Sequence, residues 1–420
     1  MIQTKTAERI ISSPIKQELS LAELIPVLLV AGTGFLVDVY DIAIFFVVRV
    51  SSLKSLGVQE EQLFSTGVGL LNLQVIGMVL GAFIWGVLGD KKGRKFALFG
   101  SILLYSIATF LNGFVHSVLT YGILRFIAGI GLAGEVGAAI TIAAEVTPAK
   151  YRGYATGFVR SLGLAGALLA SLAGDRLPWR MAYLIAGSVG FLLLFARMSI
   201  KETDIFAQIM SDRKVVRGSV KLLLLNKDRL LRLVRCVLAA MPYWFVFGVL
   251  IAFAPEVSAK LGNGTLTVSV ASATFYGAIG TVIGEMGCGV LSQILRSRKK
   301  AMLIFLAGLA AFGTAIFKAP VQSYAFICFP LGLLLGYFSV ILTTTAEQFG
   351  TNLRSTSTIL VPNLVRTSVV PITLSFSALS ASYGVLAGAT IVGSICLIVS
   401  LVSILQMEET FARDLNFVDL

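Results

Sequence analysis

Ionisable side chains occur inside long apolar runs of this 420-residue sequence. Asp38 and Asp41 are three residues apart, so a helix would place both carboxylates on one face. A charge inside a bilayer costs about 2.5–3.5 kcal/mol on insertion scales, and such a residue usually faces a cavity, a partner or a substrate. Two adjacent carboxylates cannot both ionise at little cost in a low dielectric, so one should hold a proton near neutral pH. We therefore predict that Asp38, Asp41 and Glu135 handle protons.

Arginine side chains in similar runs are candidates for binding a substrate. Arg160 is eight residues past Arg152, about 12 Å along a helix, and Arg366 is twelve residues past Arg354, about 18 Å and close to mid-bilayer. A guanidinium binds carboxylate or phosphate in a forked geometry, so Arg366 is the best single candidate for holding an anionic group. The predicted substrate-binding residues are Arg125, Arg160, Tyr243, Asn363 and Arg366.

These residues also have plainer structural interpretations. Arg125 could form an ion pair with Asp38 or Asp41 that holds helices together, and we weigh this equally with substrate binding. Tyr243 could be an ordinary core or lipid-facing aromatic residue. No nucleophile, base and orienting group occur as a recognisable set, so we do not expect an enzyme.

Membrane-spanning helices must position these side chains. The chain is 56% hydrophobic and only 13% charged, with a mean hydropathy of +0.89, whereas soluble domains are about 45–50% apolar. The sequence predicts an all-α polytopic membrane protein with about twelve transmembrane helices. The predicted helices begin near residues 24, 65, 96, 119, 153, 181, 231, 267, 301, 322, 356 and 383.

The longest polar stretch divides the predicted helices six and six, and an internal repeat supports that division. Ala144-Glu145 followed by Arg152 recurs as Ala346-Glu347 followed by Arg354, at a shift of 202 residues. This predicts two six-helix pseudo-symmetric bundles with the substrate held between them near mid-bilayer. The predicted boundaries are an N-terminal tail at 1–22, bundles at 23–198 and 231–406, a central loop at 199–230, and a C-terminal tail at 407–420.

A second marker of the repeat lies in a charged turn. Gly86-Val87-Leu88 recurs as Gly289-Val290-Leu291 at a shift of 203. At that shift the later residues of the turn differ, since Arg94 corresponds to Ser297. We expect the repeat to be degenerate there.

Basic residues predict how the chain crosses the membrane. The net charge is +12, but the lysines and arginines occupy short turns rather than one face, which argues against a nucleic-acid partner. Basic residues in short loops remain on the cytoplasmic side. We expect both termini in the cytoplasm and the protein in the plasma membrane, which is the inner membrane if the host is bacterial.

The turn from Gly86 to Lys95 reads GVLGDKKGRK and separates two uncharged runs. It resembles the signature loop of the major facilitator superfamily, Gly-x-Leu-x-Asp-x-x-Gly-Arg-Lys, which lies between the second and third helices of that family. The resemblance implies a cytoplasmic charge network that is made in one conformation and broken in another. Its expected members are Gly86, Asp90, Gly93, Arg94, Glu145, Arg152, Glu347 and Arg354.

Two further stretches resemble branches of that family. Asp38-Val39-Tyr40-Asp41 looks like the Asp-x-Tyr-Asp of phosphate:proton symporters, and Gly131 to Glu135 looks like the Gly-Gly-Glu stretch of metabolite:proton symporters. The resemblance implies proton-coupled symport of a small polar or anionic metabolite, such as an organic acid or amino acid, by alternating access. Proton-driven export of a metabolite or drug, and phosphate symport, remain as alternatives. An ion channel would need a continuous polar pore.

Other motifs have structural explanations. The stretch from Gly129 to Gly134 fits a dinucleotide-binding pattern but lacks the required strand, and its small residues suit close helix packing in a membrane. The four cysteines all fall in apolar segments with no paired spacing. We therefore expect no disulfide, metal or cofactor. The expected partners are a small-molecule substrate, protons and the lipid bilayer, and we expect a monomer.

Overall fold

The computed structural model describes residues 8–10, 21–197, 218–262 and 267–419. Within them, nine helical segments are long and apolar enough to cross a membrane. Three further helices lie between these segments along the chain: α6 (Arg152–Arg176), α7 (Trp179–Arg197) and α14 (Arg298–Ala315). The described part of the chain thus contains twelve long helical segments, and each begins within four residues of its predicted start.

The first six segments run from residue 21 to residue 197. They are α1 (Leu21–Ser55), α2 (Leu63–Lys92), α3 (Arg94–Asn112), α4 (Val118–Leu132) with α5 (Glu135–Val146), α6 (Arg152–Arg176) and α7 (Trp179–Arg197). A short 3-10 turn, η1 (Glu60–Gln62), precedes α2.

The last six segments run from residue 227 to residue 406. They are α10 (Lys227–Ala239) with α11 (Met241–Phe245) and η2 (Val246–Ile251), α13 (Val270–Ile294), α14 (Arg298–Ala315), α15 (Tyr324–Leu335) with α16 (Tyr337–Gln348), α17 (Arg354–Thr367) with α18 (Val369–Tyr383), and α19 (Val385–Gln406). The connections contain α12 (Ala254–Leu261) and η3 (Val321–Ser323).

Local sequence explains several helix boundaries. Ser117, Ser269 and Ser297 each accept a hydrogen bond from the third backbone N–H beyond them and so cap the first turns of α4, α13 and α14. Asn226 caps α10 in the same way. Gly93 separates α2 from α3 with φ of 112°, a conformation that disfavours residues with a Cβ atom.

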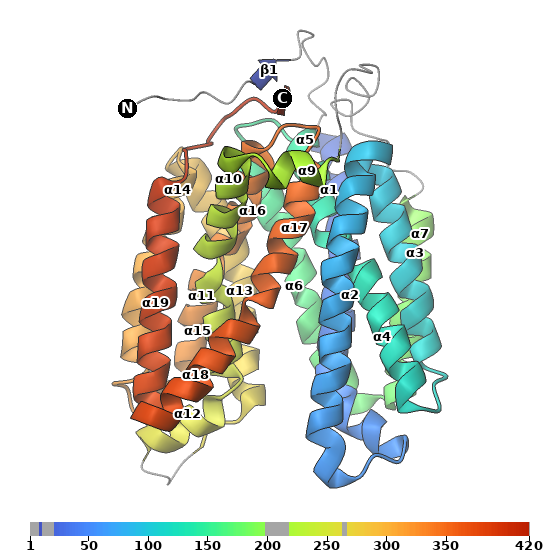
Figure 1. Ribbon diagram of the computed structural model, residues 1–420, viewed down its shortest axis with the longest axis vertical. Helices are drawn as coiled ribbons and strands as arrows, with labels where there is room; N and C mark the ends of the chain where they lie inside the picture. The colour runs from blue at the N-terminus through green and yellow to red at the C-terminus, as the bar shows by residue number, and fades with distance from the viewer. Residues whose placement is uncertain (1–7, 11–20, 198–217, 263–266, 420) are drawn as a thin grey trace.

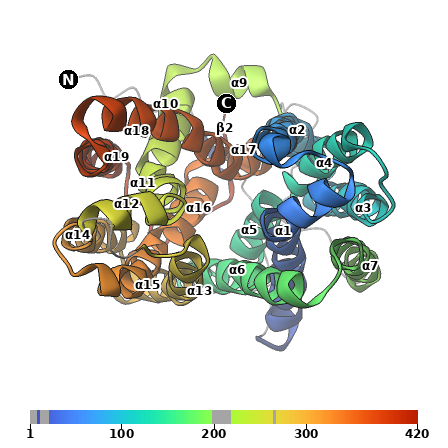
Figure 2. The same cartoon turned by 90° about the horizontal axis from the view of Figure 1, so that it is seen from below.

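The helices form two groups that lie side by side (Figures 1 and 2). In the view from below, α1 to α7 occupy one side and α10 to α19 the other, and the groups meet where α6 lies beside α13 and α2 beside α17. Both groups rely on glycine for close helix approach. A Cβ atom on Gly129 would overlap the Gln74 carbonyl oxygen of α2, and one on Gly131 would overlap Tyr105 of α3. This geometry agrees with the packing role predicted for the 129–134 stretch.

Both ends of the described chain lie on one face, which we call the terminal side (Figure 1). There β1 (Glu8–Ile10) pairs antiparallel with β2 (Phe417–Asp419). The predicted C-terminal tail is packed onto the protein as far as residue 419, and we call residues 407–419 the C-terminal strap. Leu415 lies between Ala144 and Ala346, one from each group of helices.

The predicted central loop is partly helical. Residues 198–217 lie outside the described part of the chain, as does most of the predicted N-terminal tail. The described remainder of the loop contains α9 (Val220–Leu224) and the start of α10 at Lys227. Asn226, which caps α10, explains why a polar stretch becomes helical here.

Candidate functional site: a central charged cluster and a terminal-side network

Five buried or half-buried polar side chains meet near the middle of the spans, and we call them the central cluster. Four were predicted as substrate-binding or proton-coupling residues, and the two groups of helices both contribute. The members are Asp38 on α1, Arg160 on α6, Tyr243 on α11, Glu285 on α13 and Arg366 on α17 together with their aromatic neighbours.

The strongest contact of the cluster joins the two groups. Arg160 donates from Nη2 to Oε1 of Glu285 at 2.7 Å and from Nε to Oε2 at 3.2 Å. Glu285 is fully buried, and Arg160 is 4% exposed. Tyr243 lies within hydrogen-bonding contact of Arg160. This bidentate geometry is the strong form of an arginine–carboxylate pair.

Asp38 lies within electrostatic reach of Arg160 in this pair. It is 1% exposed, and its Oδ1 has no hydrogen-bond partner among the described residues. Arg160, Arg366 and Glu135 are within electrostatic range of it. A buried carboxylate oxygen without a partner is costly when ionised. Asp38 is therefore a suitable carrier of an exchangeable proton.

The two other predicted proton-coupling residues have defined partners. Asp41 accepts hydrogen bonds from Thr109 at 2.7 Å and from Arg125 at 3.2 Å. Glu135 accepts from Ser101 at 3.2 Å. Asp41 is thus held by two partners, whereas Glu135 lies at the start of α5, within electrostatic reach of Asp38.

Arg125 forms the ion pair that was the structural alternative to substrate binding. It is fully buried, and besides Asp41 it donates to Gln74 at 2.5 Å. Its guanidinium lies 4.7 Å from the centre of the Phe45 ring. Arg125 is thus engaged by Asp41 and Gln74, while its Nε has no hydrogen-bond partner among the described residues.

The remaining predicted substrate-binding residues lie where the groups meet. Arg366 contacts the sulfur of Met78 on α2 at 2.7 Å. Asn363, one turn earlier on α17, donates to the Ala133 carbonyl at 3.2 Å and to the Ile359 carbonyl at 2.8 Å. Asn363 therefore bridges the groups, and its amide nitrogen is already used.

The residues of the predicted charge network gather on the terminal side. Asp90, at the end of α2, accepts from the backbone N–H groups of Ser355 at 3.0 Å and Thr356 at 2.9 Å. The Thr356 hydroxyl adds a third bond at 2.6 Å. Asp90 therefore caps the first turn of α17, which belongs to the opposite group of helices, and the negative charge suits a helix N-terminus.

Glycines allow this close approach. A Cβ atom on Gly86 would lie 3.0 Å from the Thr356 Cα. One turn further along α2, a Cβ atom on Gly89 would overlap the Ser355 hydroxyl. The spacing of the signature loop thus places two glycines and Asp90 on the face of α2 that meets α17.

Two glutamates complete the network in a repeated pattern. Glu145 accepts from Arg94 of its own group at 3.1 Å and from Arg354 of the other group at 2.7 Å. Glu347 accepts from Arg298 of its own group at 2.9 Å and from Arg152 of the other group at 3.0 Å. All six side chains are buried, with that of Arg152 the most exposed at 6%.

This pattern corrects the correspondence expected from the sequence. At a shift of 203 Arg94 corresponds to Ser297. The side chain that makes the equivalent ion pair is Arg298, one residue later. Arg94 begins α3 and Arg298 begins α14, and each binds the glutamate of its own group. The two groups of helices therefore have an arginine in equivalent positions in space, although a shift of 203 residues pairs Arg94 with Ser297.

Glu285 and Arg298 were missed from the sequence. Glu285 carries the one charge in the run from Val270 to Ile294, so the rule that selected Asp38 and Arg160 would also have selected it. In the sequence Arg298 is one of several basic residues in a short turn. Its role needed the structure, because Lys299 and Lys300 beside it have the same charge.

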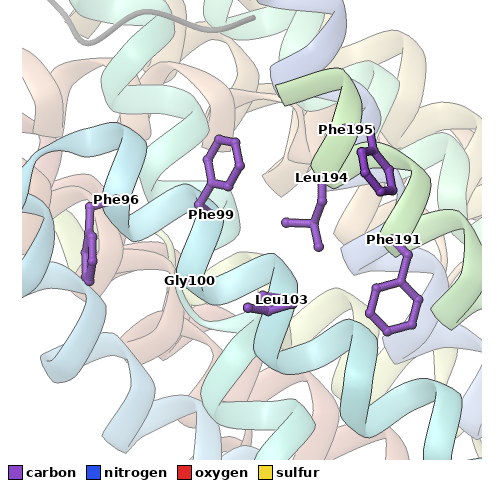
Figure 3. A pocket seen from close by; sticks show the side chains of 7 residues that line it. All are labelled: Phe96, Phe99, Gly100, Leu103, Phe191, Leu194 and Phe195. Atoms are coloured by element: carbon purple, nitrogen blue, oxygen red, sulfur yellow. The ribbon is translucent and has the colours of Figure 1, made fainter. Parts of the chain in front are cut away.

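An apolar groove lies between α3 and α7, away from the central cluster (Figure 3). Its lining comprises Phe96, Phe99, Gly100, Leu103, Phe191, Leu194 and Phe195. None of these side chains can hydrogen-bond a polar metabolite. Phe195 is 71% exposed, as expected for a surface that faces lipid.

The fold and these buried charges define a polytopic helical membrane transporter. The chain belongs to the Major Facilitator Superfamily, whose family model matches residues 30–368. The sialic acid transporter NanX of Escherichia coli is 25% identical to it over 84% of this chain and 87% of that protein. The cis,cis-muconate transport protein of Acinetobacter baylyi is 25% identical over 83% and 87% respectively.

Solved structures agree on the fold. The proton:xylose symporter XylE matches with a TM-score of 0.74, covering 94% of this chain and 98% of that chain at 18% identity. The family and its relatives are transporters rather than enzymes. Among the described residues no group of three or more histidine, cysteine or acidic side chains could hold a metal, and the four cysteines are free and buried.

Proposed function

We propose that this protein moves a small organic carboxylate together with protons into the cell by alternating access. The observation that carries the proposal is the central cluster, which brings two arginines and two carboxylates from opposite groups of helices together at mid-span. Arginine suits a carboxylate, and buried acids suit a proton. Two relatives carry carboxylic acids, sialic acid and cis,cis-muconate.

Within this proposal the charged residues have separate tasks. Arg160 and Arg366 bind the anionic group of the substrate. Asp38 carries a proton, because its Oδ1 has no hydrogen-bond partner among the described residues. Glu135 relays protons toward the terminal side. Asp41 and Arg125 hold α1 against α4, and Asp41 takes part in coupling only if that ion pair opens.

We assign the terminal side to the cytoplasm. Its turns carry Lys91, Lys92 and Lys95, and Lys299 and Lys300 at the start of α14, in keeping with the positive-inside rule. The hydrogen bonds between the groups run from this side to mid-span, from Asp90 with Thr356 to Arg160 with Glu285. The conformation described is therefore the one closed to the cytoplasm. A single chain provides the whole site, in keeping with a monomer in the plasma membrane.

The test is uptake into liposomes that contain the purified protein. We expect an inward proton gradient to drive accumulation of a labelled carboxylate, with benzoate, sialic acid, cis,cis-muconate and inorganic phosphate compared. Arg366→Ala should abolish uptake. Accumulation of phosphate alone would favour the phosphate symporter, and substrate movement only against the proton gradient would favour an exporter. Either result would overturn the proposal.

A further inference from the structure

Glu285 forms the innermost ion pair between the two groups of helices. We propose that Glu285 occupies the subsite on Arg160 in which the carboxylate of the substrate binds, and that the substrate displaces it. This inference rests on the function proposed above and adds the position of the subsite, its preference for a flat acid, and the group that leaves. The sequence analysis did not assign a role to Glu285.

The geometry of the pair is the first argument. Both guanidinium contacts, at 2.7 Å and 3.2 Å, go to the two oxygens of one carboxylate. A carboxylate of any small organic acid has the same size and charge, so it can replace Glu285 on Arg160 without a change in the arginine. The subsite is thus formed and filled by the protein itself in this conformation.

The surroundings of Arg160 are the second argument, and they indicate which acids fit. The guanidinium lies 4.9 Å from the centre of the Phe35 ring and 5.0 Å from that of Phe338. Tyr243 stands against Phe338, with ring centres 5.0 Å apart. Aromatic faces beside an anion site favour a flat, apolar body next to the carboxylate. An aromatic acid should therefore bind better than a polyhydroxylated acid.

The cost of burying the pair is the third argument. Removing two charges from water can exceed the attraction between them, so a buried ion pair is weak evidence for a stabilising role. Ionisable side chains inside a membrane more often mark a substrate or ion path. Arg160 and Glu285 also belong to opposite groups of helices, so exchange of partners at this point can change how the groups meet.

Glu285 lies next to the close contact of α6 with α13, which we call the seam. This position connects substrate binding with movement of the two groups of helices. One turn from Glu285, a Cβ atom on Gly289 would overlap the Gly153 carbonyl oxygen of α6. The Ser339 hydroxyl of α16 donates to the Glu285 carbonyl at 2.9 Å. When the substrate takes Arg160, the ion pair between α6 and α13 is lost beside this seam. Binding therefore removes one interaction that keeps the terminal side closed.

Displacement of Glu285 also accounts for proton uptake. A displaced glutamate in this buried position has no cation and takes a proton from the water through which the substrate entered. The substrate anion and the proton then enter together, and the net charge of the cluster does not change. The titratable groups within electrostatic reach of Glu285 are Arg160 on α6, Tyr243 on α11 and Cys288 on α13 itself.

The experiment measures benzoate binding to the purified protein as a function of pH. Each proton that accompanies benzoate should lower its affinity about tenfold for each unit of rise in pH. In Glu285→Gln we expect tight binding that has lost one such tenfold step per pH unit, with benzoate exchange retained and proton-driven accumulation reduced to the part that Asp38 supports. Glu256→Gln, an exposed glutamate on α12, is the matched control and should behave as the wild type. Gluconate should bind more weakly than benzoate.

Each result decides a separate point. Unchanged pH dependence in Glu285→Gln would overturn this inference and leave carboxylate uptake standing. Absence of proton-driven uptake of every carboxylate by the wild type would overturn the proposed function itself. If Glu285→Gln does not fold, Glu285→Asp takes its place, because it retains the charge on a shorter side chain. Tighter binding of benzoate at high pH by Glu285→Asp than by the wild type would support displacement. Tighter binding of gluconate than benzoate would refute the preference for a flat acid.

Discussion

Two carboxylates one helical turn apart on α1 have different surroundings. Asp41 is held by Arg125 and Thr109, whereas Asp38 Oδ1 has no hydrogen-bond partner in the described part of the chain. The sequence treats the two alike, because both are aspartates in the same apolar run. Their partners come from α3 and α4, and only packing decides which aspartate receives them.

We expect this difference to appear in stability. Asp41→Asn leaves the buried Arg125 without a counter-charge, which should cost about 3–5 kcal/mol of unfolding free energy. Asp38→Asn removes a carboxylate whose Oδ1 is unpaired, so it should cost much less while it impairs proton-driven uptake. Chemical unfolding of both variants in detergent measures the two costs.

A double variant provides the control for this prediction. Asp41→Asn combined with Arg125→Gln removes both charges, so its cost should be smaller than the sum of the two single changes. Equal destabilisation by Asp38→Asn and Asp41→Asn would contradict the separate roles given to these residues.

At the scale of elements, α6 and α13 meet through glycine. A Cβ atom on Gly289 would overlap the Gly153 backbone, and one on Gly157 would lie 3.0 Å from the Glu285 carbonyl oxygen. The helices can approach this closely because neither has a side chain at these positions. The seam therefore belongs to the conformation that is closed on the terminal side.

A larger side chain in the seam should favour the opposite conformation. We expect Gly289→Leu to separate the terminal-side ends of the two groups, because its side chain would meet backbone atoms that cannot move aside. Spin labels on Lys91→Cys and Lys300→Cys, with the native cysteines replaced, would measure the separation. Gly287→Leu is the matched control on the same helix, since nothing lies within 4 Å of a Cβ atom there. The same distance distribution in both variants would exclude the seam as a determinant of closure.

At the scale of the whole molecule, the C-terminal strap connects the two groups. Arg152 of the first group donates to the Arg413 carbonyl at 3.1 Å, and Arg354 of the second donates to the Leu415 carbonyl at 2.8 Å. Asp419 forms an ion pair with Arg232 at 3.1 Å. The strap thus binds the same arginines that bind Glu347 and Glu145.

The start of the strap is anchored at α14. Burial alone would raise the pKa of the Glu409 carboxyl, but hydrogen bonds from Ser297 and from the backbone N–H groups of Arg298 and Phe411 outweigh it and hold that pKa below its usual value. Glu409 is therefore ionised at neutral pH and caps α14, where a negative charge is favourable.

Removal of the strap should weaken closure. Deletion of residues 413–420 removes the Arg413 carbonyl, which accepts from Arg152 of the first group, and the Leu415 carbonyl, which accepts from Arg354 of the second. A hydrogen bond to a charged group contributes about 1.5–3 kcal/mol, so we expect the conformation open on the terminal side to rise at least about tenfold. The spin-label pair at Lys91→Cys and Lys300→Cys would report this change. Glu408→Gln, whose side chain is 77% exposed, should have no effect, and a deletion that behaves like it would show that the strap does not hold the closed state.

Helix positions and the choice of charged candidates could be predicted from the sequence for one physical reason. A bilayer demands long apolar helices and penalises charge within them, so both features are visible residue by residue. The signature loop likewise predicts one charge network of Asp90, Arg94, Glu145 and Arg152, repeated by Glu347 and Arg354. The helical segments begin close to their predicted positions, whereas the pairing is crossed, with Arg354 on Glu145 and Arg152 on Glu347.

The pairing of those charges depends on the tertiary structure. Arg160 finds Glu285 across 125 residues of sequence, and Arg298 rather than Ser297 takes the place equivalent to Arg94. The burial of residues 407–419 is equally invisible in their composition, which is that of an ordinary polar tail. Composition and hydropathy determine that ionisable groups must be shielded in the membrane. Which partner shields each one is decided by helix packing, because the partners come from segments that are distant in the chain.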